Sequence, residues 1–424
     1  MFYRRKLSIS LFISLYYMNS FFAFMIIIVL VGLLVVRLNL QPFLSLLISA
    51  IVYGLMLGMS SELIGYIKTG LANVFSTLAI IIFCGAIIAE YLRANSAIDR
   101  IVADLILLTG RDKGLLATGF AGYLVSVPVM CCITTYLILE PVMKGLGERI
   151  EGAGTRFQLM LAVSSVISFN LIYPAPVMLT LTGSLGIRPI DALKVGLPVS
   201  ILLLALMYIY VNYILKSPVK SSETSEPEAL LTSRIYAWGP FLLPIILILI
   251  GLVFEEASFI GSPNIAILIG AIVSLGAAGE RSKAIISTAS RRAGVILLDL
   301  CGAGALGHVI SESNFAEALQ ISFGQALPLL VTPFLISAMI QLAQGSRVVT
   351  VVIAAEILAG YPIGGLPLAL LICAGAFVFS FVSDPYFWFV SATTEATLKE
   401  MIMGYTLPLT ICGAVAFGLV LLVF

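Results

Sequence analysis

Charged residues are scarce in this chain. Asp, Glu, Lys and Arg make up only 11% of its 424 residues, and the net charge is +1. The Lys and Arg residues are dispersed between apolar runs instead of forming a patch, which excludes a nucleic-acid partner. The composition also excludes a soluble globular domain, because 60% of the residues are hydrophobic and the mean hydropathy is +1.12.

Histidine is nearly absent and cysteines are few. The single histidine, His308, leaves no means to assemble a Ser-His-Asp triad or a histidine metal motif. The six cysteines lie in apolar surroundings without a CxxC pair, which favours buried thiols over disulfides or metal ligands. The string GAGALG at 302–307 matches GxGxxG, but it lies in a membrane segment with no strand before it. We therefore expect no cofactor and no metal.

Most of the chain consists of long apolar runs. A membrane span needs about 20 apolar residues, so these runs predict an all-α polytopic membrane protein with roughly ten to twelve segments, some of them re-entrant. The basic residues 4–6 precede an apolar run that continues through Val36 without a convincing cleavage site. This favours a retained first span over a signal peptide, with Met18 or Met25 as alternative starts.

The longest polar stretch divides the chain near its middle. Residues 216–234 are rich in Ser, Glu and Pro, which is typical of a flexible linker. The sequence therefore predicts a first membrane repeat at 1–215 and a second at 235–424. An odd number of spans in each half would make the repeats inverted, the arrangement that alternating access uses.

Two interrupted apolar segments fall at corresponding places in these halves. A shift of 217 positions lays Cys84, followed by Gly and Ala, over Cys301, followed by the same two residues. The same shift lays Pro128 over Gly345. Proline and glycine interrupt helices, and paired interrupted segments indicate a secondary transporter's binding site near the membrane midplane. We therefore predict two helix breaks around a substrate.

An arginine follows the second break, in an apolar stretch at 343–358. A guanidinium near the bilayer centre costs about 2.5 to 3.5 kcal/mol, so it is kept where it meets water, a counter-charge or an anion. Arg347 suits a carboxylate clamp, because its planar guanidinium can bind a carboxylate through two hydrogen bonds. The alternative is a structural ion pair with Asp384 or Asp299.

Polar side chains and prolines near the breaks complete the predicted substrate site. The hydroxyl and amide groups could bind substrate hydroxyls, although Ser and Thr also bond to their own helix backbone. The predicted substrate-binding residues are Pro128, Thr134, Thr135, Tyr173, Pro174, Pro176, Gln344, Gly345, Ser346 and Arg347.

Acidic residues in apolar surroundings are candidates for ion coupling. Asp384 precedes Pro385 in an aromatic setting, where desolvation favours the neutral form that a proton-coupling group needs. A helix cap before Pro385 is its structural alternative. Ser383 accompanies Asp384, and Glu356 is a second acid that could instead face water at the end of its segment. His308 could sense pH, or simply lie at the interface.

Four stretches of the chain match a known pattern. They are AQGSRVVTVVIAAEIL from Ala343, SFVSDPYFWFV with Thr397, Leu398 and Lys399 after it, NLIYPAPVMLT from Asn170, and GLPVSILL from Gly196. They resemble the gluconate/proton symporters of the ion-transporter superfamily. The resemblance covers most of the chain. It implies a scaffold part and a transport part, two re-entrant hairpins, an elevator-like movement, a homodimer, and proton-driven uptake of sugar acids or hydroxy acids across a prokaryotic cell membrane, with membrane lipid around it.

The chain departs from that family pattern at three places. Met130, Cys131 and Cys132 stand where the family typically has Phe-Phe-Asp after the hairpin proline. The motif Tyr-Pro-Ala-Pro at 173–176 replaces His-Pro-Gly-Pro, and Arg347 occupies a position that is usually small. A lost acid and a gained cation shift the expected substrate towards more negative molecules.

Our leading hypothesis is therefore a proton-coupled symporter of small organic anions. A sodium-coupled transporter of dicarboxylates with the same fold is the first alternative, with carbonyls at the helix breaks holding the ion. A membrane-embedded enzyme acting on lipid-linked substrate is the second, but it needs clustered acids, histidines or a metal set that the sequence does not offer.

Overall fold

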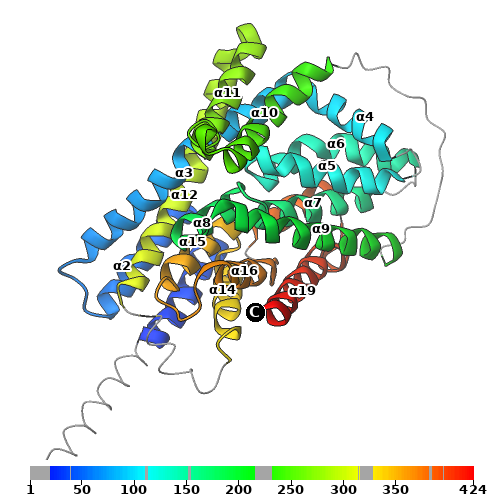
Figure 1. Cartoon of the computed structure of the whole chain (residues 1–424). Coiled ribbons are helices and arrows are strands. Elements are labelled where there is room, and N and C mark those ends of the chain that lie inside the picture. Colours follow the sequence, from blue (N-terminus) through cyan, green and yellow to red (C-terminus); the bar gives the residue numbers. More distant parts are fainter. Residues whose placement is uncertain are drawn as a thin grey trace, which may run out of the picture.

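The chain is described by a computed structural model in which helices and turns, and no strand, occur among the described residues (Figure 1). This confirms the predicted all-α class. The predicted linker at 216–234 lies mostly outside the described residues, as does the start of the predicted first span. The described residues are 20–38, 40–109, 113–150, 154–214, 232–313, 315, 328–381, 384–394 and 396–424.

The first half opens with an apolar helix at Ser20–Val35. Its further helices are α2 (Pro42–Met56), α3 (Leu63–Ala94), α4 (Ala97–Thr109), α5 (Gly114–Val129), α6 (Cys132–Ile150), α7 (Gly154–Leu171), α8 (Pro176–Ser184) and α9 (Pro189–Tyr213). The second half contains α10 (Arg234–Val253), α11 (Pro263–Ala278), α12 (Ser282–Ser311), α14 (Val331–Gln344), α15 (Arg347–Ile357), α16 (Gly365–Phe377), α17 (Pro385–Thr394), α18 (Leu398–Met401) and α19 (Leu407–Val423).

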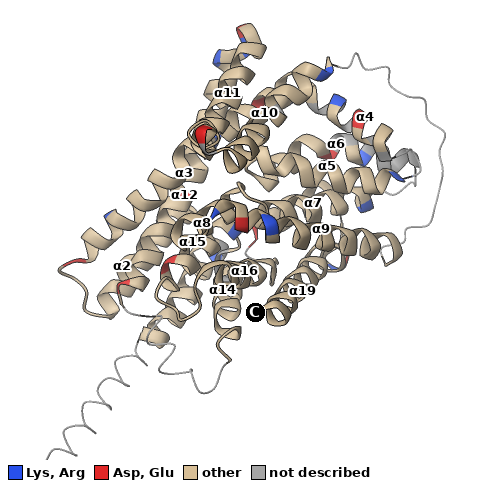
Figure 2. Cartoon of the chain, in the orientation of Figure 1, with Lys and Arg blue, Asp and Glu red and all other residues tan. Residues whose placement is uncertain are grey.

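Five helical stretches among the described residues are long and apolar enough to cross a membrane, and a pair bent by 47° between Arg234 and Val253 makes a sixth. Charged side chains lie mainly near helix ends (Figure 2). Five further apolar helices have 10–17 residues. The predicted ten to twelve segments include these shorter helices, and which of them cross the membrane stays a prediction.

The two longest helices, α3 and α12, pack antiparallel along each other. Arg281, just before α12, donates a hydrogen bond of 2.8 Å to the carbonyl of Ala94 at the end of α3. At the other end, the rings of Tyr66 and His308 lie 6.2 Å apart. The helices approach closely where Gly70 meets Gly304, since a Cβ on Gly70 would stand 2.3 Å from the Gly304 carbonyl oxygen.

Helix α7 lies at the centre of the fold. Its residues from Arg156 to Leu171 are all buried, although several are polar. Asn170 Nδ2 donates to the carbonyl of Cys373 on α16 at 2.9 Å, and Cys373 Sγ lies 3.3 Å from the carbonyl of Asn170. Buried polar groups in a membrane protein need such partners, so these bonds fix α7 against α16.

Local sequence signals place corresponding helix ends in the two halves. Proline occupies the first turn of α2 and of α11, and also of α8 and of α17, where its missing N–H costs no helix bond. Helices α5 and α14 each end on a residue with left-handed backbone, Met130 at φ 57° and Gly345 at φ 78°. These matching helix ends fit the predicted pair of repeats at 1–215 and 235–424, which stays a prediction.

Candidate functional site

The two helix breaks meet at one cavity. The first lies between α5 and α6 at Met130 and Cys131, and the second lies between α14 and α15 at Gly345 and Ser346. Residues of both line a cavity of about 380 Å³, together with residues of α3, α12 and the starts of α8 and α17. The first break falls two residues after Pro128, which sits in the last turn of α5, because the left-handed Met130 ends the helix there.

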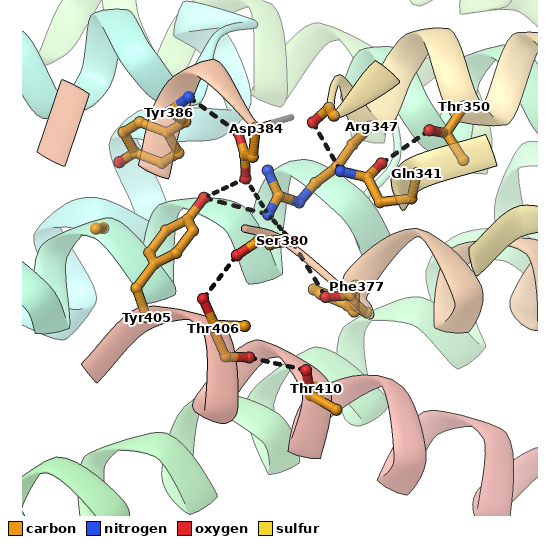
Figure 3. Close-up of polar contacts among 12 residues, drawn as sticks. Gln341, Arg347, Thr350, Phe377, Ser380, Asp384, Tyr386, Tyr405, Thr406 and Thr410 are labelled. Carbon is orange, nitrogen blue, oxygen red and sulfur yellow. Dashed lines mark hydrogen bonds and ion pairs between the residues drawn. The ribbon is translucent and has the colours of Figure 1, made fainter. Parts of the chain in front are cut away.

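Arg347 lies at the start of α15 and is 96% buried, with 4% of its surface exposed. Its Nη2 donates to Ser380 Oγ at 2.6 Å, to Asp384 Oδ2 at 3.2 Å and to Tyr405 Oη at 3.2 Å (Figure 3). Arg347 Nε is buried without a hydrogen-bond partner among the described residues. The guanidinium is thus paired through Nη2, while its Nε is one donor left without a partner.

Asp384 uses its two carboxylate oxygens for different bonds. Oδ1 accepts the backbone N–H of Tyr386 at 2.9 Å, which caps α17. Oδ2 accepts the hydroxyl of Tyr405 at 2.9 Å in addition to the bond from Arg347. The cap and the ion pair that the sequence offered as structural alternatives are therefore both present. Removing one partner of such a buried pair lowers the stability of a protein by about 3–5 kcal/mol, because the other charge is left buried and unpaired.

A second set of hydrogen bonds fixes the break before Arg347. Gln341 Nε2 donates to the carbonyl of Gly345 at 2.7 Å, and Thr350 Oγ1 donates to Gln341 Oε1 at 2.8 Å (Figure 3). All three residues are buried. A carbonyl freed by a broken helix needs a partner inside a membrane, and Gln341 supplies it from the preceding helix.

Several predicted site residues line the shared cavity. Its lining includes Pro176, Gly345, Ser346, Arg347 and Asp384. It also includes Asp299, whose Oδ1 accepts the backbone N–H of Phe43 at 3.1 Å. Of the two acids that the sequence offered for an ion pair with Arg347, the structure pairs Asp384 with it, at 3.2 Å.

Other predicted residues lie elsewhere. Thr134 borders a smaller cavity beside Arg292. Thr135 Oγ1 donates to the carbonyl of Cys131 at 2.9 Å, which is the backbone bond named as its alternative. Tyr173 is buried in the turn between α7 and α8, with Pro174 after it. Glu356 lines a different cavity.

Two predictions fall on positions that the structure does not describe in full. Ser383 and the side chain of Gln344 lie outside the described residues. The predicted roles of Ser383 in ion coupling and of Gln344 in substrate binding stay predictions.

The sequence analysis missed three residues that contact the Arg347–Asp384 pair: Ser380, Tyr386 and Tyr405. Tyr386 follows Asp384 and Pro385 directly, so the helix-cap pattern could have indicated its backbone contact. Tyr405 lies in a π-helical turn at Ile402–Thr406, a feature that occurs often at functional sites but has no clear sequence signal. Ser380 is held by Thr406, whose Oγ1 donates to the carbonyl of Ser380 at 2.7 Å.

The fold resembles a solved transporter structure. The crystal structure of the Alcanivorax borkumensis YdaH transporter, described as having an unusual topology, matches with a TM-score of 0.60 at 16% identity. The match covers 84% of this chain and 88% of that one.

Sequence relatives extend over nearly the whole chain. An uncharacterized permease of Haemophilus influenzae is 26% identical, with 90% of this chain and 87% of that protein covered. The low-affinity gluconate transporter of Escherichia coli is 26% identical, with coverage of 90% and 93%. The D-serine transporter DsdX of Escherichia coli is 25% identical, with coverage of 92% and 95%. The model of the GntP family permeases matches residues 19–424, and the chain therefore belongs to the GntP permease family.

Proposed function

We propose that this protein is a secondary transporter of small organic anions, most specifically hydroxy acids or sugar acids, in the bacterial cytoplasmic membrane. The observation that carries this proposal is the buried Arg347–Asp384 pair on a cavity between two broken helices. Two relatives are named for gluconate and for D-serine. Both molecules carry a carboxylate and a hydroxyl group, which one guanidinium among polar groups can bind. Membership of a permease family also favours transport over the alternative of a membrane-embedded enzyme.

The geometry supports proton coupling, because Asp384 and a substrate carboxylate would compete for Arg347. With Asp384 ionised, the pair is neutral, and a substrate carboxylate at the guanidinium would stand beside a second carboxylate. Like charges in a buried site repel strongly. Protonating Asp384 removes one negative charge and releases the guanidinium, so that a proton and an anion bind together. Tyr405 and the N–H of Tyr386 keep Asp384 in place throughout.

An elevator-like movement fits the composition of the cavity lining. Residues of the long helices α3 and α12 line the cavity together with residues of the two breaks. Because α3 and α12 correspond in the two halves and run antiparallel, inverted repeats are the simplest account of the fold. We propose that α3 and α12 belong to a dimeric scaffold and that the breaks belong to the moving part.

The charges suggest an orientation in the membrane. Arg93, Arg281 and Arg292 lie where α3 ends and α12 begins, whereas Glu62 and Glu312 flank the opposite ends. By the positive-inside rule the arginine-rich end faces the cytoplasm.

The test uses purified protein in liposomes with labelled gluconate under an imposed proton or sodium gradient. We expect uptake driven by the proton gradient. Asp384→Asn should remove this dependence and leave gradient-independent exchange, because the amide cannot release a proton. Uptake driven only by sodium would replace the proton proposal with the sodium-coupled alternative. Absence of uptake for every organic acid offered, with the protein correctly folded, would overturn the transport proposal.

A further inference from the structure

A small cavity adjoins the central cavity beside the first helix break. Its volume is about 20 Å³, which has room for about one water molecule. Four residues line both cavities: Ile82 on α3, Met130 and Cys131 at the break, and Ile296 on α12. The two cavities are therefore direct neighbours, and the first break forms part of the wall that they share.

The other lining residues place the small cavity towards the arginine-rich end of α3 and α12. On α3, Ala86 and Ala89 follow Ile82 in the chain. On α12, Arg292 precedes Ile296 by four residues, about 6 Å along the helix axis. Because the two helices run antiparallel, both displacements point to the same end of the helix pair, the end that we assign to the cytoplasm.

Met130 lies where the two cavities meet. Its backbone is left-handed, with φ 57°. Its side chain packs against α3, since a Cβ on Gly85 would stand 2.9 Å from Met130 Cγ. A methionine side chain is unbranched and has three rotatable bonds, so it changes shape easily. A rotation of Met130 would therefore widen the connection between the cavities without breaking a polar contact of its side chain.

Arg292 belongs to a cluster that contains more arginine than acid. The carboxylate of Glu90 is buried on α3, and its Oε2 lies 3.3 Å from Nη1 of Arg292. Arg93 Nε donates to the same carboxylate at 3.1 Å. Two positive charges against one negative charge leave a formal charge of +1 in this cluster.

The surplus positive charge adjoins mostly apolar walls. Ala86, Ala89 and Val129 border the small cavity together with the two isoleucines, and Thr134 adds a hydroxyl group. A cleft with low-dielectric walls and charge of one sign concentrates the electric field and attracts the opposite charge. The side chain of Arg292 is 40% exposed, so it can meet an anion from solvent as well as border the cavity.

We propose that the small cavity is a passage for anions between the central cavity and the arginine-rich end, and that Arg292 binds the substrate carboxylate transiently there. Met130 narrows the passage in this conformation. The inference rests on the proposed function and adds to it a route and a second anion-binding residue. Arg292 lies on α12, which we assign to the scaffold, so it keeps its position while the breaks move.

The first experiment measures how fast charged thiol reagents modify Cys131. This cysteine lines both cavities and is partly exposed, whereas the other five are buried. An anionic methanethiosulfonate with a sulfonate group is compared with a cationic one that carries a trimethylammonium group. Both are applied to inside-out vesicles, which present the arginine-rich face, and Cys131→Ser gives the background rate.

The variants are Arg292→Gln and, as the matched control, Arg291→Gln. Arg291 is exposed on α12 and lines neither cavity. Arg292→Gln leaves no acid unpaired, because Glu90 keeps its bond to Arg93. We expect Arg292→Gln to lower the ratio of anionic to cationic modification rates about two- to tenfold at low ionic strength, and Arg291→Gln to change it little.

Two results would overturn the inference. An equal change of the ratio in both variants would show that general surface charge, and not Arg292, attracts the anion. Modification no faster than in Cys131→Ser would show that no passage reaches the central cavity from this face. The experiment needs no transported substrate, so it tests the passage even when the transport proposal fails.

A second experiment measures uptake of labelled gluconate from each face of the membrane, with inside-out and right-side-out vesicles. Arg292→Gln should raise the KM about two- to fivefold from the arginine-rich face and leave the KM from the other face unchanged. Arg292→Lys keeps the charge and should stay close to the wild type. An equal rise from both faces would contradict the passage. A wild type that takes up no organic acid instead marks failure of the proposed function.

Discussion

At the scale of single residues, the candidate site contains a charge pair with almost no exposed surface. Arg347 and Asp384 are both almost fully buried, and the remaining bonds of the guanidinium and the carboxylate come from Ser380, Tyr405 and the N–H of Tyr386. A buried pair of this kind adds little net stability compared with apolar residues, but an unpaired buried charge is costly. We therefore propose a functional reason, more than a stabilising one, for its position beside a cavity.

The cost of an unpaired buried charge predicts how single and double substitutions of Arg347 and Asp384 affect stability. Arg347→Gln should lower the free energy of unfolding by about 3–5 kcal/mol, because it leaves the Asp384 carboxylate buried without a counter-charge. The double variant with Asp384→Asn removes both charges and should recover most of that loss. Thermal denaturation in detergent measures both. We expect neither variant to bind gluconate, since the guanidinium is gone, and a double variant no more stable than Arg347→Gln would contradict the ion-pair account.

At the scale of secondary-structure elements, a residue near each helix break in the sequence sets the position of that break. The residues that contact Arg347 come from distant parts of the chain. Gly345 marks the second break at its position, and Pro128 marks the first within two residues, because each acts on its own backbone. The partners of Arg347 lie 33 to 58 residues further along the chain. Tertiary packing brings Ser380 and Tyr405 to it, and no local pattern encodes that packing. The apolar runs and their two interruptions therefore predicted the helices and both helix breaks. Of the contacts around Arg347, the sequence offered the ion pair and the cap of Asp384, but not the bonds to Ser380 and Tyr405.

The second break offers a test of this local encoding. Gly345 has φ 78°, a left-handed conformation that costs a residue with a Cβ about 1–2 kcal/mol. Gly345→Ala should lower the stability by this amount and weaken substrate binding, because the hydrogen bond from Gln341 to the Gly345 carbonyl would shift. Gly294→Ala is a matched control, since Gly294 lies within helix α12 and has open space around it. Equal melting temperatures for the two variants would show that the break tolerates a side chain.

At the scale of the whole molecule, the two halves are tied together near the predicted linker. Asp104 on α4 accepts hydrogen bonds from Arg234 Nη2 at 2.9 Å and from Trp238 Nε1 at 2.9 Å, both at the start of α10. Arg100 lies 3.4 Å from the same carboxylate. These contacts connect the first half to the beginning of the second, on the arginine-rich side that we assign to the cytoplasm.

This tie predicts a pH-dependent contribution to stability. The hydrogen bond from Arg234, followed by that from Trp238, lowers the pKa of Asp104 below its ordinary value against the opposing effect of burial. A carboxyl whose pKa is lower in the folded state stabilises the protein above its unfolded pKa, and this contribution disappears as the pH falls through the folded pKa. Because Arg234 is largely exposed, solvent screens the pair and keeps this contribution small. Asp104→Asn should therefore have a lower melting temperature than the wild type at pH 7, and this difference should disappear near and below pH 4.

A difference in melting temperature that stays constant from pH 7 to pH 3 would contradict this prediction. It would show that the carboxylate charge does not hold α4 to α10, and that the bond from Trp238 alone makes the connection.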